Sequence, residues 1–138
     1  MLTFFIMSKK VQVLIYAKKD HLLLRLKLVD NRGGFWQNIT GHVEPHEAIE
    51  RAAQTELKEE IGLDCLLSPL PYQFSFHDRF GHDVIEYVYF AHVDESFKPN
   101  LSEEHSAYEW KCIHDITPED FGYPSNYKAL EILREIFR

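Results

Sequence analysis

Residues 41–63 read GHVEPHEAIERAAQTELKEEIGL, and this stretch decides the fold. Gly41 precedes a segment, residues 47–61, in which apolar residues recur with helical periodicity. Gly62 comes directly after the last apolar position, where glycine commonly ends a helix because it adopts left-handed backbone angles. The stretch therefore predicts a glycine loop followed by a helix of about four turns.

Three glutamates lie close together near the end of this predicted helix. Glu56, Glu59 and Glu60 are spaced i, i+3 and i+4, so they share one helical face. Like charges at this spacing cost about 0.2–0.5 kcal/mol per pair. On a helical wheel Glu56 and Glu60 continue the apolar line of the helix, which argues against a merely solvated face. Buried carboxylates need partners, and Mg²⁺, which prefers oxygen ligands, is a suitable one.

Composition and charge narrow the class of protein. The 138 residues suffice for a single domain, 1–138, and the hydrophobic fraction of 45% suits a globular chain. With 15 basic and 22 acidic residues the formal net charge is −7, which disfavours binding to nucleic acid. No apolar run reaches the roughly 18 residues of a membrane helix. Cys65 and Cys112 lack the spacing of a zinc site, so we interpret them as reduced thiols of a cytoplasmic protein.

Strands are expected on both sides of this helix. Runs of β-branched and aromatic residues predict strands at 11–16, 21–27, 36–40, 73–76, 84–93 and 106–113. Thr117 before Pro118 predicts a short helical turn, and apolar positions between 129 and 137 predict an amphipathic final helix. This order favours an α/β or α+β sandwich with a mixed sheet. Residues 1–7 are interpreted as a flexible extension, because Met7 before Ser-Lys-Lys makes a natural start.

The 41–63 stretch resembles the signature of the Nudix hydrolase family, a glycine, five residues, a glutamate, seven residues and then Arg-Glu-hydrophobic-x-Glu-Glu-x-Gly-hydrophobic. Eight of the nine specified positions match, namely Gly41, Glu47, Glu56, Leu57, Glu59, Glu60, Gly62 and Leu63. The departure is Thr55, where the family has arginine. Residues 35–41, 104–110 and 126–131 are similar to segments of bacterial dihydroneopterin triphosphate pyrophosphatases, also described as dATP pyrophosphohydrolases.

The resemblance implies a Nudix-type α/β/α sandwich and a Mg²⁺-dependent pyrophosphohydrolase, with Mn²⁺ as a possible substitute. The implied substrate is a (deoxy)nucleoside triphosphate such as dATP, or dihydroneopterin triphosphate, cleaved to the monophosphate and pyrophosphate. The implied metal ligands are the carboxylates of Glu56, Glu59, Glu60 and Glu104 and the carbonyl of Thr40. Glu56, Glu59 and Glu104 are the expected catalytic residues, and either Glu56 or Glu104 could accept the proton of the attacking water.

Three residues outside the signature are candidates for substrate binding. Phe35 and Trp36 could stack on a flat base or pterin ring, or could equally anchor a loop. Asn126 could contact the substrate or cap the last helix. The expected partner is a small nucleotide or pterin triphosphate, bound by a monomer or homodimer. Two alternatives stay open: hydrolysis of dinucleoside polyphosphates, nucleoside diphosphate sugars or oxidised dGTP, and a non-catalytic nucleotide-binding module.

Thr55 generates the first prediction. In the family the missing arginine pairs with the residue equivalent to Glu47 and braces the loop against the helix, and Arg51 or Lys58 could substitute for it here. We expect Thr55→Arg to restore the brace and so to raise activity or the thermal unfolding temperature. A clear loss of both, measured by product release and by melting, would show that the helix is adapted to threonine.

Overall fold

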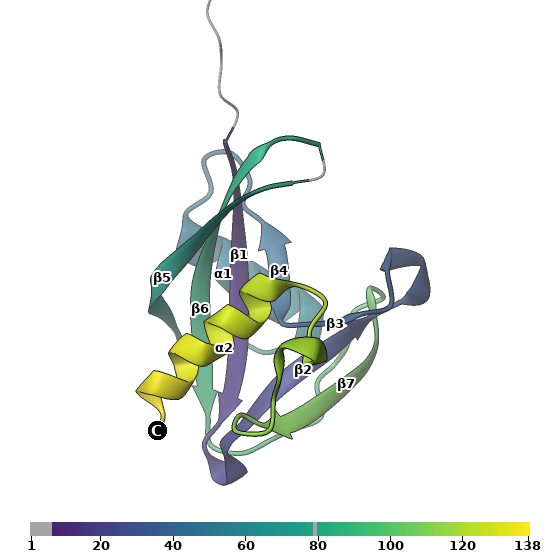
Figure 1. Cartoon of the computed structure of the whole chain (residues 1–138), viewed down its shortest axis with the longest axis vertical. Coiled ribbons are helices and arrows are strands. Elements are labelled where there is room, and N and C mark those ends of the chain that lie inside the picture. Colours follow the sequence, from purple (N-terminus) through teal and green to yellow (C-terminus); the bar gives the residue numbers. More distant parts are fainter. Residues whose placement is uncertain (1–6, 79) are drawn as a thin grey trace, which may run out of the picture.

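Strand β1 (Met7–Ala17) is the central element of a seven-stranded mixed sheet. Along its whole length β1 pairs in parallel with β6 (Asp83–Val93). On its other edge β1 pairs antiparallel with β4 (Ile39–His42) through residues 10–13, and with the start of β2 (Leu22–Leu28) through residues 16 and 17. The sheet therefore divides along this edge of β1, and β4 and β2 leave it in different directions (Figure 1).

The remaining strands extend the two sides of the sheet, and one helix covers each face. Strands β3 (Trp36–Gln37) and β7 (His105–Cys112) both pair antiparallel with β2, while β5 (Leu67–His77) pairs antiparallel with β6 at the opposite edge. Helix α2 (Pro124–Ile136) crosses the front of the sheet in Figure 1, and helix α1 (Ile49–Ile61) lies behind it. The predicted α/β/α sandwich with a mixed sheet is confirmed.

The structure is a computed structural model that describes residues 7–78 and 80–138. Apart from Met7, whose backbone begins β1, the expected N-terminal extension lies outside these residues. The predicted turn after Thr117 is present as the short helix η3 (Pro118–Asp120). Neither α1 nor α2, nor any other helix of the described residues, has the length and apolarity needed to span a membrane.

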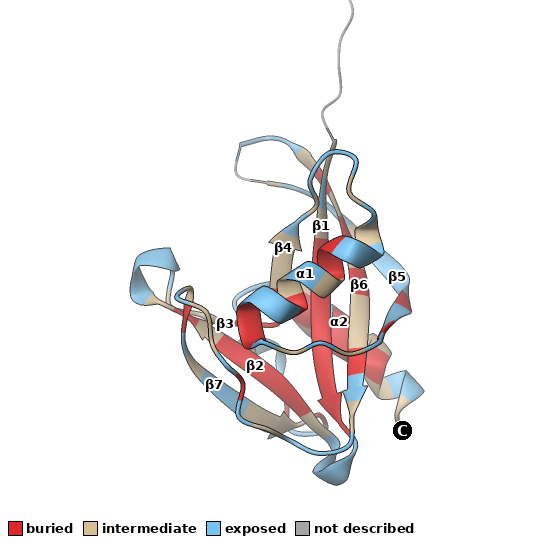
Figure 2. Ribbon diagram, turned by 180° about the vertical axis from the view of Figure 1, so that it is seen from behind, coloured by how far each residue is buried: buried red, intermediate tan, exposed pale blue. Residues whose placement is uncertain are grey.

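The core has two halves because successive side chains of β1 point to opposite faces of the sheet. Val11, Val13 and Ile15 pack in the cluster beneath α1, whereas Leu14 and Tyr16 pack in the cluster beneath α2. Figure 2 shows β1 buried along most of its length. Because α1 contributes fully buried side chains to the first cluster, its position over β1 and β4 is fixed by packing.

Helix α1 begins two residues later than the sequence predicts and ends where expected. His46 has a positive φ of 69°, and Ala48 is extended, so the helix cannot start at 47. At the other end Gly62 takes a φ of 70°, and its N–H donates to the carbonyl of Lys58. The predicted glycine stop is thus confirmed, and it sets where the carboxylates near the helix end lie.

Strand β5 is longer than the predicted segment 73–76. The sequence conceals its first half because Pro69 and Pro71 are typical strand breakers. In the structure the pairing with β6 shifts between Pro69 and Gln73, which marks a bulge, and β5 lies at the edge of the sheet. Prolines are tolerated at such positions because their missing N–H removes no bond within the ladder.

Candidate functional site

The predicted site forms where the C-terminal half of α1 lies over β4. Glu56 projects from α1 against the backbone of Gly41, which follows Thr40 in β4. A Cβ atom built on Gly41 would lie 2.1 Å from Cδ of Glu56 and 2.4 Å from its Oε1. Only glycine permits this close approach of a carboxyl group to the strand. The first glycine of the motif is therefore explained by the placement of Glu56.

Negative charge is concentrated around Glu56. Burial is the largest cause that raises the pKa of Glu56 from 4.5 to about 7, and the charges of Glu59, Glu60, Glu104 and Glu47 add to it. Glu104 comes from the loop before β7, so the fold brings this distant carboxylate within electrostatic reach of the helix. Glu56 is half-buried and Glu60 is buried, as the helical wheel predicts, whereas Glu59 is exposed.

Glu60 lies in a different environment from its neighbour. Its Oε2 accepts a hydrogen bond from Oγ of Ser102 at 2.9 Å and lies 2.8 Å from Nδ1 of His105. Burial acts to raise the pKa of Glu60, but the contacts with His105 and Ser102, and a side-chain contact with Glu104, hold that pKa below its ordinary value. The surroundings of Glu56 and Glu60, one helical turn apart, thus shift their pKa values in opposite directions.

The loop before β7 also fixes Glu104. The backbone N–H of Glu104 contacts Oγ of Ser102 at 3.3 Å, and its carbonyl accepts a hydrogen bond from Val29 at 2.9 Å. Its carboxylate lies 3.3 Å from the guanidinium of Arg32, and both of these side chains are substantially exposed. Surface ion pairs of this kind contribute little to stability, so this contact orients Glu104 only weakly.

The donor set fits a hard divalent cation. All the candidate ligands are oxygen atoms, the type that Mg²⁺ prefers. Among residues 7–78 and 80–138, neither Glu56 nor Glu59 has a Lys, Arg or His partner within ion-pair distance. Within the same ranges no three His, Cys, Asp or Glu side chains converge closely enough to form a metal cage as they stand. The carboxylates are near enough to repel one another, and of the four only Glu60 and Glu104 have a basic side chain beside them.

Glu47 braces the loop in a way that the sequence did not indicate. Its Oε1 accepts a hydrogen bond from the backbone N–H of Glu44 at 3.0 Å. Within the described part of the chain neither Arg51 nor Lys58 forms an ion pair with Glu47, so both suggested substitutes for the missing arginine are wrong. Thr55 is exposed. The hydrogen bond from the Glu44 backbone to Glu47, within the loop, thus replaces the expected ion pair between Glu47 and the helix.

Phe35 comes directly before β3 and Trp36 is its first residue, and both rings contact other residues of the protein. A Cβ atom at Gly122 would lie 2.4 Å from Cδ2 of Phe35, whose ring also meets Tyr123 edge-on at 4.9 Å between centroids. The guanidinium of Arg25 stacks over the ring of Trp36 at 4.6 Å. These contacts give both aromatics an anchoring role, while Trp36 remains half-exposed.

Asn126 belongs to a buried polar cluster and does not cap α2, since the helix starts two residues earlier at Pro124. Its Oδ1 accepts a hydrogen bond from the backbone N–H of Asn38 at 2.6 Å. Asn38 also donates to Gln12, which in turn donates to Glu86. Two atoms of the cluster, Oδ1 of Asn38 and Nδ2 of Asn126, are buried without a hydrogen-bond partner. Such orphaned groups cost free energy and can mark a site for a polar ligand.

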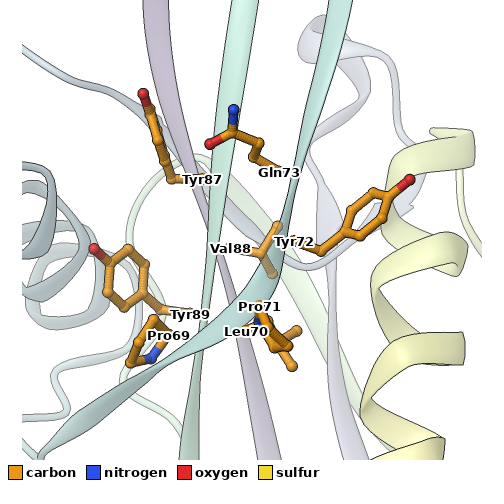
Figure 3. A pocket seen from close by; sticks show the side chains of 8 residues that line it. All are labelled: Pro69, Leu70, Pro71, Tyr72, Gln73, Tyr87, Val88 and Tyr89. Carbon is orange, nitrogen blue, oxygen red and sulfur yellow. The ribbon is translucent and has the colours of Figure 1, made fainter.

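A pocket of about 310 Å³ at the β5 bulge is separate from these carboxylates. Figure 3 shows that it lies between β5 and β6, with Tyr87, Tyr89 and Gln73 among its walls. No residue predicted for catalysis, metal binding or substrate binding lines it. The glutamates predicted for the chemistry lie on α1 and in the loop before β7. The motif gives no signal for the residues that contact this site or the Asn126 cluster, namely Gln37, Asn38, Ser102 and His105.

Comparison with known proteins agrees with this geometry. The NUDIX domain model matches residues 8–131. The chain is 30% identical to nucleoside triphosphatase NudI of Escherichia coli, over 93% of this chain and 96% of that protein. It is also 30% identical to isopentenyl-diphosphate Delta-isomerase of Pectobacterium atrosepticum, over 89% of this chain and 72% of that protein.

The solved structure of the E. coli dihydroneopterin triphosphate pyrophosphohydrolase superposes with a TM-score of 0.79 and 26% identity, covering 89% of this chain and 92% of that one. The chain belongs to the Nudix family. The predictions of the family, of its sandwich fold and of a hydrolase are thereby confirmed.

The close approach at Gly41 generates a second prediction. Gly41→Ala forces the Glu56 carboxyl to move, and misplacing a catalytic group by about 1 Å can cost about 100-fold in rate. We expect a loss of that order in hydrolysis with little loss of stability, because the atoms that must give way belong to the end of the flexible Glu56 side chain. Adding Gly41→Ala to Glu56→Gln should then cost little further activity, and fully additive losses would show that glycine acts through some other group.

A third prediction concerns pH in metal-free protein. The pKa of Glu56 is about 7 in the folded chain and near the ordinary 4.5 when unfolded, so between these values the folded state binds more protons. The contribution of this carboxyl to stability is therefore lost as pH rises through that window. At pH 8 and in chelator, we expect Glu56→Gln to melt at a higher temperature than wild type, and at pH 4 the difference should vanish. Equal melting at both pH values would contradict the charge cluster.

Proposed function

We propose that the chain is a Mg²⁺-dependent pyrophosphohydrolase. It cleaves a (deoxy)nucleoside triphosphate such as dATP, or dihydroneopterin triphosphate, to the monophosphate and pyrophosphate. The observation that carries the proposal is the carboxylate cluster around Glu56, whose side chain lies against the Gly41 backbone and has no basic partner among the described residues. The printed names of two similar proteins, a nucleoside triphosphatase and a dihydroneopterin triphosphate pyrophosphohydrolase, support this substrate class.

The proposed metal ligands are the carboxylates of Glu56, Glu59, Glu60 and Glu104 and the backbone carbonyl of Thr40. Mg²⁺ is the proposed ion, and Mn²⁺ can substitute because it accepts the same oxygen ligands. When bound, the ion neutralises charge on the phosphate oxygens and helps to orient the attacking water. Mutual repulsion of the carboxylates favours binding of a cation in a place where the chain supplies few positive groups.

Glu56 and Glu104 are the proposed proton acceptors. Water attacks a phosphorus atom, one of these carboxylates takes its proton, and the P–O bond to the leaving group breaks. Proton transfer is most effective when the pKa of the base is close to the working pH. Without metal, burial and the neighbouring carboxylates raise the pKa of Glu56 to about 7, and a bound cation would lower it again, so Glu56 and Glu104 both stay candidates. Glu59 is exposed, and its proposed part is to act on Glu56 by charge and to bind the ion.

The proposed substrate-binding residues are Phe35, Trp36 and Asn126. The half-exposed ring of Trp36 offers a surface for a base or pterin ring, while Phe35 holds the loop against Gly122. The orphaned Nδ2 of Asn126 is a donor and the orphaned Oδ1 of Asn38 is an acceptor. Purine and pterin rings carry adjacent donors and acceptors that complement such a pair. Because both atoms are buried, the start of α2 must move for a ring to reach them.

Two other classes of function remain as alternatives. The first keeps the fold and changes the substrate to a dinucleoside polyphosphate, a nucleoside diphosphate sugar, oxidised dGTP or, given the similarity to an isopentenyl-diphosphate isomerase, a prenyl diphosphate. The second is a module that binds nucleotides without turnover, which the substitution at Thr55 favours. We propose that the protein acts on its small-molecule substrate in the cytoplasm, as a monomer or homodimer.

The fourth prediction tests this assignment directly. Purified protein with Mg²⁺ is screened for pyrophosphate release from dNTPs, NTPs and dihydroneopterin triphosphate, and for inorganic phosphate release from isopentenyl diphosphate. We expect turnover of at least one triphosphate, and a loss of about 100-fold or more in Glu60→Gln, since even residues that support a ligand contribute about 10–100-fold. Glu131→Gln, an exposed glutamate of α2, is the matched control and should retain activity. Tight nucleotide binding without turnover in any metal would instead support the binding module.

A further inference from the structure

A buried contact reaches Glu60 from outside the motif helix. His105 begins β7, and its Nδ1 lies 2.8 Å from Oε2 of Glu60. The His105 side chain is 1% exposed and that of Glu60 is 7% exposed, so water does not compete for this contact. Oγ of Ser102 donates to the same oxygen at 2.9 Å. Two side chains from residues 102–105 thus hold one oxygen of Glu60.

Gln37 determines which imidazole nitrogen faces the carboxylate as a donor. Nε2 of Gln37 lies 3.2 Å from Nε2 of His105, and both residues are buried. An amide NH₂ group donates and cannot accept, so Nε2 of His105 accepts and the ring proton resides on Nδ1. Nδ1, which then carries the ring proton, lies 2.8 Å from Oε2 of Glu60, and it is buried without an aligned hydrogen-bond partner. Gln37 thus contacts one nitrogen of the His105 ring, and the carboxylate of Glu60 lies close to the other.

The backbone around this chain is held in place by the end of α1. Ser102 N–H donates to the carbonyl of Glu60 at 3.2 Å, and Asn100 N–H donates to that of Ile61 at 3.1 Å. These bonds satisfy carbonyls that a helix end otherwise leaves unpaired. On the other side His105 pairs with Leu28 in the sheet. The helix end and the sheet together place the imidazole beside Glu60.

We propose that His105, oriented by Gln37, is a positioning residue that holds Oε2 of Glu60 and leaves Oε1 to bind the divalent ion. The inference rests on the proposed function, in which Glu60 is a metal ligand. Hydrogen-bond partners of a ligating group fix its orientation, and their loss typically costs about 10–100-fold in metal affinity. The motif spacing assigns no role to position 105, so the role comes from the fold alone.

Two substitutions of similar polarity separate positioning from mere packing. In His105→Asn the amide nitrogen is as many bonds from Cβ as Nδ1 is, so a donor toward Glu60 is retained. In His105→Gln the amide nitrogen lies one bond further out, toward the place of Nε2, and the donor to Glu60 is lost. Both variants keep an uncharged polar side chain in the cavity, so a purely structural role would make them alike. His114→Gln, at an exposed histidine, is the matched control.

The readout is Mn²⁺ affinity of the full chain without substrate, measured by electron paramagnetic resonance of free Mn²⁺. We expect His105→Gln to bind about 10–100-fold more weakly than wild type, and His105→Asn and the His114 control to stay within about threefold. Circular dichroism melts establish that each variant is folded. Equal affinities for His105→Asn and His105→Gln would overturn the positioning role.

Glu60→Gln in the same titration distinguishes failure of this inference from failure of the proposed function. If Glu60→Gln binds Mn²⁺ as tightly as wild type, Glu60 is no ligand and the metal assignment fails first. If Glu60→Gln loses affinity while the two His105 variants stay equal, only the positioning role fails. Should neither His105 variant fold, Ser102→Ala decides, because it removes the other donor to Oε2. A measurable weakening in Ser102→Ala supports the held oxygen, and unchanged affinity overturns it.

Discussion

Carboxylates gathered between α1, β4 and the loop before β7 impose the constraint on which the rest of the site depends. Like charges in a partly buried place repel one another strongly, because the protein screens them less than water does. The chain places no basic residue within ion-pair distance of Glu56, among the residues that the structure describes. Packing elsewhere must therefore hold α1 in position against this repulsion. The side chains of Leu57 and Ile61, buried in the core beneath the helix, do so.

Two glutamates on the same helix, Glu56 and Glu60, have different surroundings and opposite pKa shifts. Glu56 has few hydrogen-bond donors, lies against the Gly41 backbone and has a raised pKa. Glu60 is deeper, yet contacts with Ser102 and His105 keep it charged and its pKa low. Environments that separate the pKa values of adjacent acids commonly mark a division between proton transfer and charge stabilisation. Here the difference between the two pKa values follows from which element each carboxylate meets.

Much of this arrangement could be predicted from the sequence because it is local. The helix, its glycine stop and the inward line of Glu56 and Glu60 all follow from spacing within one segment. The partners of Glu60 could not be predicted, because Ser102 and His105 lie far from it in the chain and reach it only through the fold. The first half of β5 could not be predicted as a strand for another reason. Its prolines read as breakers, although an edge strand with a bulge accommodates them.

The most direct test of the metal site is anomalous scattering from crystals soaked in Mn²⁺. We expect a peak within about 2.5 Å of carboxylate oxygens of Glu56 and Glu60, with the Thr40 carbonyl beside it. Oε2 of Glu60 should remain on His105 and Ser102 while Oε1 contacts the ion. A fully occupied Mn²⁺ site elsewhere on the molecule, with no peak between α1 and β4, would contradict a metal site at Glu56 and Glu60.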